Sequence, residues 1–227
     1  MRMNVLMISP GYPAEMAFFT RGLGRAGATV IGLGDQSTEA LPPAARDALD
    51  HYIQVGSLAD DDRVAATVRD LARQVQVNRV ECLWEPYMLL AGRLREELGL
   101  PGLTVAQTVP FRDKERMKQL LDAAGLRTPW HKEAATVAEV WAAAERVGYP
   151  LIVKPIDGAG SADTYRADSV AELDAILPGL RHVPRVSVEE FIEAEEFTYD
   201  TICAGGNVLV ENICPVSYTH LTLPTKA

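Results

Sequence analysis

A lysine at the end of an apolar run is the first residue whose position suggests chemistry. Lys154 closes the segment Tyr149-Pro-Leu-Ile-Val-Lys154, which has the pattern of a buried strand. Burying an unpaired ammonium is costly, so we expect Lys154 to face an anion. The chain continues through Gly158, Gly160 and Ser161, whose small size lets backbone N–H groups approach phosphate oxygens. This pattern predicts a phosphate site, and the lysine before the glycines distinguishes it from a Walker A loop.

Three glutamates follow on two predicted strands. Glu189 and Glu190 lie in the alternating run 186–192, and Glu196 opens the next strand, 196–202. Carboxylates placed in this way can accept hydrogen bonds from the hydroxyl or amino groups of a ligand. The alternative is an acidic strand face in contact with water, and only the spacing of the three residues favours a site.

Predicted helices separate these strands. Asp113 can cap a helix that Gly125 ends, with Lys114 in its first turn. Thr136 with Glu139 forms a capping box for a second helix. Ser169 with Glu172 forms another for a short third helix, through about residue 177, and Gly205-Gly206 predicts a hairpin turn into a strand over 208–213. The residues expected to face inward are Met117, Leu120, Leu121 and Ala124 in the first helix, and Val137, Val140, Trp141 and Ala144 in the second.

The first hundred residues alternate strands with helices. Strands are expected over 4–9, 29–33, 52–55 and 80–84, and helices over 14–26, 60–75 and 87–98. This alternation predicts a parallel, doubly wound α/β sheet. Ligands of such sheets gather beyond the carboxyl ends of the strands, where Gly11, Gly34-Asp35 and Glu85 lie.

A dinucleotide-binding fingerprint is missing from the first of these ends. Gly11 starts no Gly-x-Gly-x-x-Gly pattern, and Gly22-Leu-Gly24 falls inside a predicted helix. We therefore reject a dinucleotide site. Glu85 either faces a substrate or complements the dipole of the helix that it precedes, and we favour the second interpretation.

The composition excludes several classes of partner. The net charge of −9 provides no basic field, so we expect neither a nucleic acid nor a membrane as partner. The N-terminus lacks a signal-peptide pattern, and no apolar run is long enough to span a membrane. The three cysteines lack metal-ligand spacing, and Cys82 and Cys203 are expected to be buried free thiols. A cytoplasmic location fits these features.

In their order, the segments of the second half resemble the ATP-grasp superfamily. Each segment alone is weakly specific, whereas their order and spacing over roughly residues 110–214 form a specific signal. The first hundred residues resemble the pre-ATP-grasp domain of that superfamily in pattern only. The matching segments are Asp113-Lys114 with Gly125-Leu-Arg-Thr-Pro129, Tyr149-Pro-Leu-Ile-Val-Lys154-Pro155, Gly158-Ala-Gly-Ser161, and Val188-Glu-Glu-Phe-Ile192 with Glu196-Phe197.

The resemblance implies a set of nucleotide contacts. Lys114 and Lys154 would contact the phosphates of ATP. Gly158, Gly160 and Ser161 would close over these phosphates as a lid. Without the resemblance, Lys114 would be interpreted as a surface lysine.

The same resemblance places the adenosine part of the nucleotide along residues 188–196. Glu190 would offer its backbone carbonyl to adenine and Ile192 its N–H, while the Glu189 carboxylate would accept from the adenine amino group. Glu196 would take the ribose hydroxyls. Asp163 departs from the pattern, because many relatives have a glycine there.

The expected fold class is α/β. A pre-ATP-grasp Rossmann-like parallel sheet is expected over 1–108, followed by an incomplete α+β ATP-grasp domain over 109–214. Residues 215–227 resemble the translation of a sequencing-library adapter and are expected to be non-native. Native sequence would then stop near Cys214, ahead of the magnesium ligands and the catalytic arginine of the superfamily. We therefore name no catalytic or metal-binding residue, and we expect the fragment to be inactive and to bind ATP weakly.

The implied function is that of a ligase joining a carboxylate to an amine through an acyl phosphate, with ATP and Mg²⁺ as cofactors. One alternative is a non-catalytic nucleotide-binding or sensing module. A second is a biotin carboxylase-like subunit, which the short segment Gly158–Ser161 disfavours. The small carboxylate substrate and the amine are not identified by the sequence. The oligomeric state, a homo-oligomer included, stays open.

Overall fold

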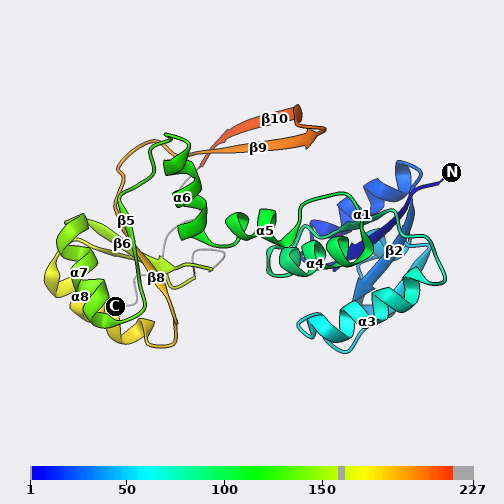
Figure 1. Ribbon diagram of the computed structural model, residues 1–227, viewed down its shortest axis with the longest axis horizontal. Coiled ribbons are helices and arrows are strands. Elements are labelled where there is room, and N and C mark those ends of the chain that lie inside the picture. The colour runs from blue at the N-terminus through cyan, green and yellow to red at the C-terminus, as the bar shows by residue number, and fades with distance from the viewer. Residues whose placement is uncertain (1, 158–161, 217–227) are drawn as a thin grey trace.

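Two lobes and a projecting hairpin make up the chain (Figure 1). The computed structural model describes residues 2–157 and 162–216 of the sequence. The short helix α5 (Val105–Thr108) lies between the lobes (Figure 1). Gly158, Gly160, Ser161 and the tail beyond 216 lie outside the described residues. Within the two described ranges, every helix is too short or too polar to cross a membrane.

A four-stranded parallel sheet forms the first lobe, in the order β3-β2-β1-β4. Its strands are β1 (Asn4–Ile8), β2 (Thr29–Gly34), β3 (His51–Gln54) and β4 (Arg79–Glu81). Its helices are α1 (Met16–Arg25), α2 (Pro43–Arg46), α3 (Asp61–Ala72) and α4 (Met88–Leu98). The α/β fold class predicted from the alternation of strands and helices is confirmed.

Successive residues of β1 pack into two different layers. Leu6 and Ile8 belong to a core that also holds buried residues of α3 and α4. Val5 and Met7 pack instead with Met16 of α1. Neighbouring residues of a strand point to opposite faces of the sheet. Since both sets of β1 residues pack against helices, helices cover the sheet on both sides. Both faces of β1 are therefore apolar, which explains its continuous apolar run.

The cysteines of the two lobes have different environments. Cys82, which follows β4, is a buried free thiol, as predicted. The same prediction for Cys203 is wrong, because this residue lies on a strand of the hairpin and is exposed. Its apolar neighbours in the sequence suggested burial, but no described element covers that strand.

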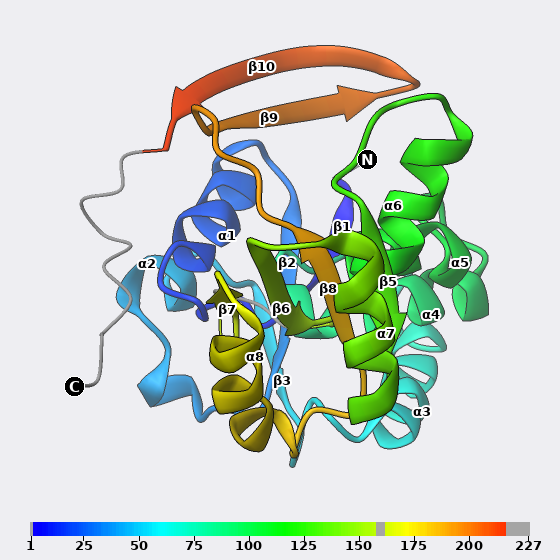
Figure 2. The same cartoon turned by 90° about the vertical axis from the view of Figure 1, so that its left-hand side faces the viewer.

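A four-stranded antiparallel sheet forms the second lobe, in the order β5-β8-β6-β7. Its strands are β5 (His131–Ala134), β6 (Leu151–Pro155), β7 (Tyr165–Ala167) and β8 (Val186–Glu190). Its helices are α6 (Lys114–Ala123), α7 (Val137–Val147) and α8 (Val170–Ile176). Figure 2 shows α7 and α8 in front of the sheet, where residues of both helices share one core with β6 and β8.

Local capping explains where these helices begin. Asp113 accepts a hydrogen bond from the N–H of Arg116, and Thr136 with Glu139 forms the complete predicted capping box. Ser169 caps α8, but the Glu172 carboxylate bonds to the N–H of Asp168 rather than to that of Ser169. The second half of that predicted box therefore differs.

In α6 and α7, some residues predicted to face inward are exposed. The apolar face of α6 is largely exposed, with Met117 39% and Leu120 43% accessible, whereas Glu115 and Lys118 are buried. The reason is that α6 packs its charged face against polar side chains of the sheet. Val137 is likewise exposed at the first turn of α7, while Val140 and Ala144 are buried as expected.

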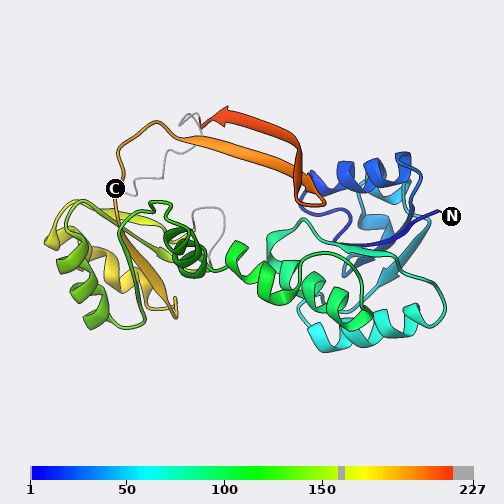
Figure 3. The same cartoon turned by 45° about the horizontal axis from the view of Figure 1, so that its top comes forward.

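The hairpin extends away from the second lobe (Figures 1 and 3). Its strands are β9 (Phe197–Ala204) and β10 (Asn207–Pro215), which pair with each other and with no other described strand. Gly205 and Gly206 form the turn with φ angles of +57° and +79°. Glycine adopts such left-handed angles without steric cost, and the predicted tight turn is confirmed.

The second-lobe core should depend on one residue of α8. Replacing the fully buried Leu173 with alanine removes contacts and leaves a cavity, so we expect unfolding free energy to fall by about 2–5 kcal/mol. Val170, 61% exposed on the same helix, gives the matched control, and Val170→Ala should change stability by less than about 0.5 kcal/mol. Urea denaturation followed by circular dichroism measures both, and equal losses would contradict this assignment of the core.

Thiol reactivity should distinguish the buried Cys82 from the two exposed cysteines. Burial raises the pKa of the Cys82 thiol to about 11, so at pH 8 only about one part in a thousand is thiolate. Iodoacetamide should therefore modify the exposed Cys203 and Cys214 first and Cys82 only after unfolding. Peptide mass spectrometry of native and urea-treated samples checks this order. Rapid modification of Cys82 in the native chain would show that its burial is wrong.

Candidate functional site

A cavity of about 350 Å³ lies in the second lobe, beside the end of β8. Lys154, Glu189, Glu190, Ile192 and Glu196 all line it, so the structure brings five of the predicted residues together. Lys154 comes from β6, and the other four come from β8 and the segment that follows it. The antiparallel pairing of β6 with β8 explains the proximity of the two groups.

The Glu189 carboxylate is held between two ammonium groups. One of its oxygens pairs with Lys154 and the other with Lys118 of α6. Glu189 is 4% exposed and Lys118 3% exposed. A buried carboxylate is tolerated only where opposite charges or hydrogen bonds compensate for its lost hydration. The two lysines therefore make it possible to bury Glu189 at the edge of the cavity.

A chain of polar contacts continues from Lys118 away from the cavity. The Lys118 ammonium donates to the Ser187 hydroxyl at 3.0 Å, and this hydroxyl donates to the Glu115 carboxylate at 2.5 Å. The other oxygen of Glu115 lies 2.7 Å from Nδ1 of His131. His131 in turn contacts Asp122 through Nε2, at 3.2 Å. In the described part of the chain, every buried side-chain nitrogen and oxygen has a hydrogen-bond partner.

Sequence reasoning missed Lys118. The amphipathic pattern of α6 predicted that its apolar stripe faces inward, although Lys114 and Lys118 are four residues apart and therefore share a face of the helix. Glu115 lies three residues before Lys118, at a distance of 3.7 Å between the charged atoms. The position of Lys118 on the same helix face as Lys114, a predicted phosphate lysine, is the sequence feature that could have identified it.

Lys114 lies close to the start of the glycine segment. Its ammonium donates to the carbonyl of Ile156 at 3.3 Å, and its backbone N–H donates to the same carbonyl at 3.2 Å. The pKa of Lys114 is lowered, first by burial and then by the positive charge of Lys154. The two predicted lysines therefore act on each other electrostatically, and an anion between them would relieve that repulsion.

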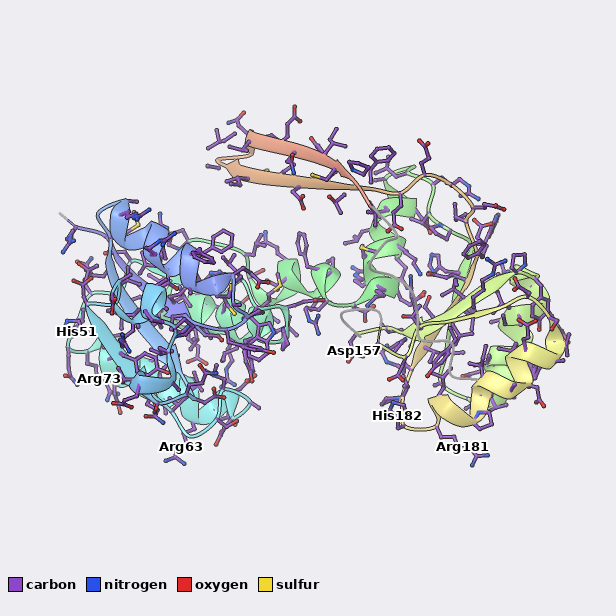
Figure 4. The ribbon with its side chains drawn as sticks, turned by 180° about the vertical axis from the view of Figure 1, so that it is seen from behind. His51, Arg63, Arg73, Asp157, Arg181 and His182 are labelled. Atoms are coloured by element: carbon purple, nitrogen blue, oxygen red, sulfur yellow. The ribbon has the colours of Figure 1, made fainter. Side chains whose placement is uncertain are left out.

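Arg112 is a second residue that sequence reasoning missed. Its guanidinium pairs with the Glu85 carboxylate of the first lobe and donates to the carbonyl of Asp157 at 3.1 Å. Its positive charge also contributes to lowering the pKa of Lys114. Three cations therefore gather near Ile156 and Asp157. Asp157 lies on the side of the second lobe that faces the first (Figure 4).

Glu85 has a contact that neither interpretation of this residue included. It begins a short 3-10 helix, Glu85–Tyr87, as the interpretation of a dipole-complementing carboxylate requires. In addition, its carboxylate forms the ion pair with Arg112. The contact joins residues 27 positions apart and connects the carboxyl end of β4 to the second lobe.

The acidic residues at the other end of the cavity differ in their contacts. The Glu190 carboxylate accepts from the N–H of Trp130 at 3.0 Å and pairs with Arg127 at 2.6 Å. Ile192 and Glu196 follow the end of β8 and are exposed.

Asp163 has a φ of +52°, a left-handed conformation that glycine adopts freely and aspartate tolerates. This angle accounts for the departure noted at that position.

Two family models match consecutive parts of the chain. The ATP-grasp N-terminal domain matches residues 24–102, and the ATP-grasp domain matches residues 111–220. The second match extends past Cys214, into the segment that we expect to be non-native. Between them the two models cover most of the chain.

Curated relatives and solved structures point to the same group of proteins. The chain is 25% identical over 229 residues to the L-arginine-specific L-amino acid ligase of Bacillus subtilis, covering 98% of the chain and 54% of that protein. It is 31% identical over 141 residues to the D-alanine–D-alanine ligase of Stutzerimonas stutzeri, covering 57% and 44%. The crystal structure of an L-amino acid ligase from Bacillus licheniformis aligns with a TM-score of 0.77 and 26% identity, covering 95% and 51%. The chain thus spans about half the length of these relatives.

The buried charges make a specific stability prediction. Lys118→Met leaves Glu115 and Glu189 with less compensation, so we expect the free energy of unfolding to fall by about 3–5 kcal/mol. The double variant Lys118→Met with Glu189→Gln should recover part of this loss, because it removes one buried charge. Urea denaturation measures all variants, and Lys132→Met on the exposed side of β5 is the control. Wild-type stability in Lys118→Met would contradict the network.

Proposed function

This chain belongs to the ATP-grasp superfamily, and from that premise we propose that it forms part of an ATP-dependent ligase joining a carboxylate to an amine. The observation that carries the proposal is the cluster of Arg112, Lys114 and Lys154 beside Asp157, next to the cavity at the end of β8. A cluster of three cations suits polyphosphate, and an exposed strand end suits the edge of a base.

The phosphates occupy the basic end in this proposal. Lys114 and Lys154 contact them, as the superfamily pattern implies, and Gly158, Gly160 and Ser161 close over them. Arg112 adds a third positive charge. Burial and, after it, the positive charge of Lys154 lower the pKa of Lys114, and this supports the assignment because bound phosphate stabilises the charged lysines.

The adenosine lies along residues 189–196 in this proposal. The carbonyl of Glu190 and the N–H of Ile192 meet the adenine edge, and Glu196 takes the ribose hydroxyls. When Lys154 turns toward phosphate, Lys118 still neutralises Glu189. The Glu189 oxygen that Lys154 leaves then accepts from the adenine amino group. The double pairing of Glu189 is what supports this exchange.

The proposed reaction has two steps. A carboxylate oxygen of the substrate attacks the terminal phosphorus of ATP, so that one P–O bond forms while the bond to ADP breaks. The amine then attacks the acyl carbon, phosphate leaves, and the nitrogen loses a proton. The cations of the chain hold the phosphoryl oxygens and stabilise the negative charge that develops on them.

Magnesium would enter with the nucleotide in this scheme. Mg²⁺ is commonly held by substrate phosphates together with one or two carboxylates. Within the described residues, no group of three or more His, Cys, Asp or Glu is placed to hold a metal ion, so we assign no ligand there.

We also propose the boundary between the two domains at residues 108 and 109.

Trapping with hydroxylamine tests the ligase in the whole protein that contains this chain. With ATP, Mg²⁺ and a panel of amino acids, we expect ADP release and a hydroxamate from at least one carboxylate. Lys154→Met should lower kcat/KM by about 10²–10³-fold, because it removes a cation that stabilises the transition state. Lys132→Met, on the exposed side of β5, should leave the rate unchanged.

The controls separate the ligase from a non-catalytic module. Thermal melting shows whether Lys154→Met remains folded. Nucleotide binding without ADP release for any carboxylate would refute the ligase and favour a nucleotide-binding or sensing role. Hydroxamate formation that Lys154→Met does not reduce would leave the reaction in place but remove Lys154 from it.

A further inference from the structure

A second cavity, of about 270 Å³, lies at the carboxyl edge of the parallel sheet in the first lobe. It is lined mainly by the ends of β1, β2 and β4 and the turns that follow them, together with Tyr52 of β3. None of the nucleotide residues described above lines it. The cavity is therefore separate from the one at the end of β8.

The strand order places this cavity where sheets of this kind bind ligands. The chain runs from β1 outward through β2 to β3 and then returns to the other side of β1 as β4. The connections on the two sides of β1 lie on opposite faces of the sheet, so a crevice opens between β1 and β4 at their carboxyl ends. Tyr12 follows β1 and Trp84 follows β4, and both line the cavity.

Two backbone positions beside the cavity, Ser9 and Gly34, have restricted conformations or restricted space. Ser9 has a φ of +53°, a strained angle for a residue with a side chain, and its hydroxyl donates to the carbonyl of Tyr12 at 2.7 Å. A Cβ atom on Gly34 would lie 2.6 Å from the hydroxyl of Tyr52. Only glycine at that position lets the Tyr52 ring form a wall of the cavity.

The single carboxylate in the lining carries the chemistry. One oxygen of Asp35 accepts from the N–H of Leu58 at 3.3 Å. Within the described residues its other oxygen has no hydrogen-bond or ion-pair partner, and no Lys, Arg or His lines the cavity. The pKa of Tyr52 is raised, first by burial and then by the negative charge of Asp35. The cavity therefore has a negative electrostatic character.

Aromatic rings make up the rest of this environment. Tyr12 and Trp84 meet edge to face with ring centroids 4.6 Å apart, and Tyr87 meets Trp84 at 4.9 Å. The faces of such rings attract cations, most strongly in the case of tryptophan. One carboxylate with aromatic walls suits an organic ammonium group and disfavours an anion.

We propose that this cavity binds the ammonium group of a small amine-bearing substrate, with Asp35 as its counter-charge and the rings of Tyr12 and Trp84 against its carbon skeleton. The inference rests on the proposed ligase function, which needs such a substrate. The chain connects the two sites, because Trp84, which lines this cavity, directly precedes Glu85, the residue that pairs with Arg112 of the basic cluster.

Titration of the chain without nucleotide tests the site. The probes are n-butylammonium, n-butanol and pentanoate, which share a butyl group and differ in charge. NMR follows the indole N–H signal of Trp84 at constant ionic strength. We expect saturable binding of n-butylammonium, about 10-fold weaker binding of n-butanol, and still weaker binding of pentanoate, because a charged hydrogen bond is lost and then a repulsion is added.

Variants at one position assign the effect to the carboxylate. Asp35→Asn should weaken n-butylammonium binding about 10-fold or more, and Asp35→Glu should retain part of the affinity. Asp70→Asn, on the surface of α3, removes a carboxylate elsewhere on the same lobe and should change nothing. Melting temperatures confirm that each variant is folded. Equal affinity for the three probes, no binding of n-butylammonium, or full affinity in Asp35→Asn would each overturn the inference.

The two proposals fail separately. If n-butylammonium binds through Asp35 while the whole protein forms no hydroxamate, the ligase is refuted and the cation site stands. If the whole protein is a ligase and Asp35→Asn leaves its KM for the amine-bearing substrate unchanged, the ligase stands and the cation site is refuted.

Discussion

A carboxylate buried against a sheet has to be neutralised where it lies, and two lysines from different elements do this for Glu189. Lys118 comes from α6 and Lys154 from β6. Ion pairs and hydrogen bonds therefore determine how α6 packs on the sheet. Separating the helix from the sheet would leave charges unpaired, at a cost of several kcal/mol. The same helix carries Lys114 at its first position. The basic cluster beside Asp157 therefore depends on the buried ion pairs.

Local chemistry in the sequence was sufficient to predict most of the elements. The capping box of Thr136 with Glu139 and the glycine turn at 205–206 depend on residues close in the chain, and both form as expected. The parallel sheet followed from apolar runs that are buried on both faces. Two strands were missed, β5 and β7, because they are edge strands of four and three residues with polar side chains. Such strands show no apolar alternation for a pattern to detect.

The order of the segments along the chain, through the family resemblance, predicted which residues would lie together. Lys154 and residues 189–196 line one cavity because β6 and β8 are neighbours in one sheet. The face of α6 was not predictable in this way, since its charged and apolar residues both fit helical spacing, and only the polar face of β8 selects between them. The contact of Arg112 with Glu85 joins two lobes. Contacts of that kind follow from tertiary arrangement, which no local pattern encodes.

The β9–β10 hairpin has a consequence for how the chain behaves in concentrated solution. Both strands are exposed along their whole described length, and their apolar side chains include Phe197, Ile202, Leu209 and Ile213. A two-stranded ribbon also has two edges with unpaired backbone groups, which can add strands from another chain. Repulsion between copies that each carry a net charge of −9 opposes such contacts, and salt screens that repulsion. The colloidal stability of the chain should therefore decrease as ionic strength rises.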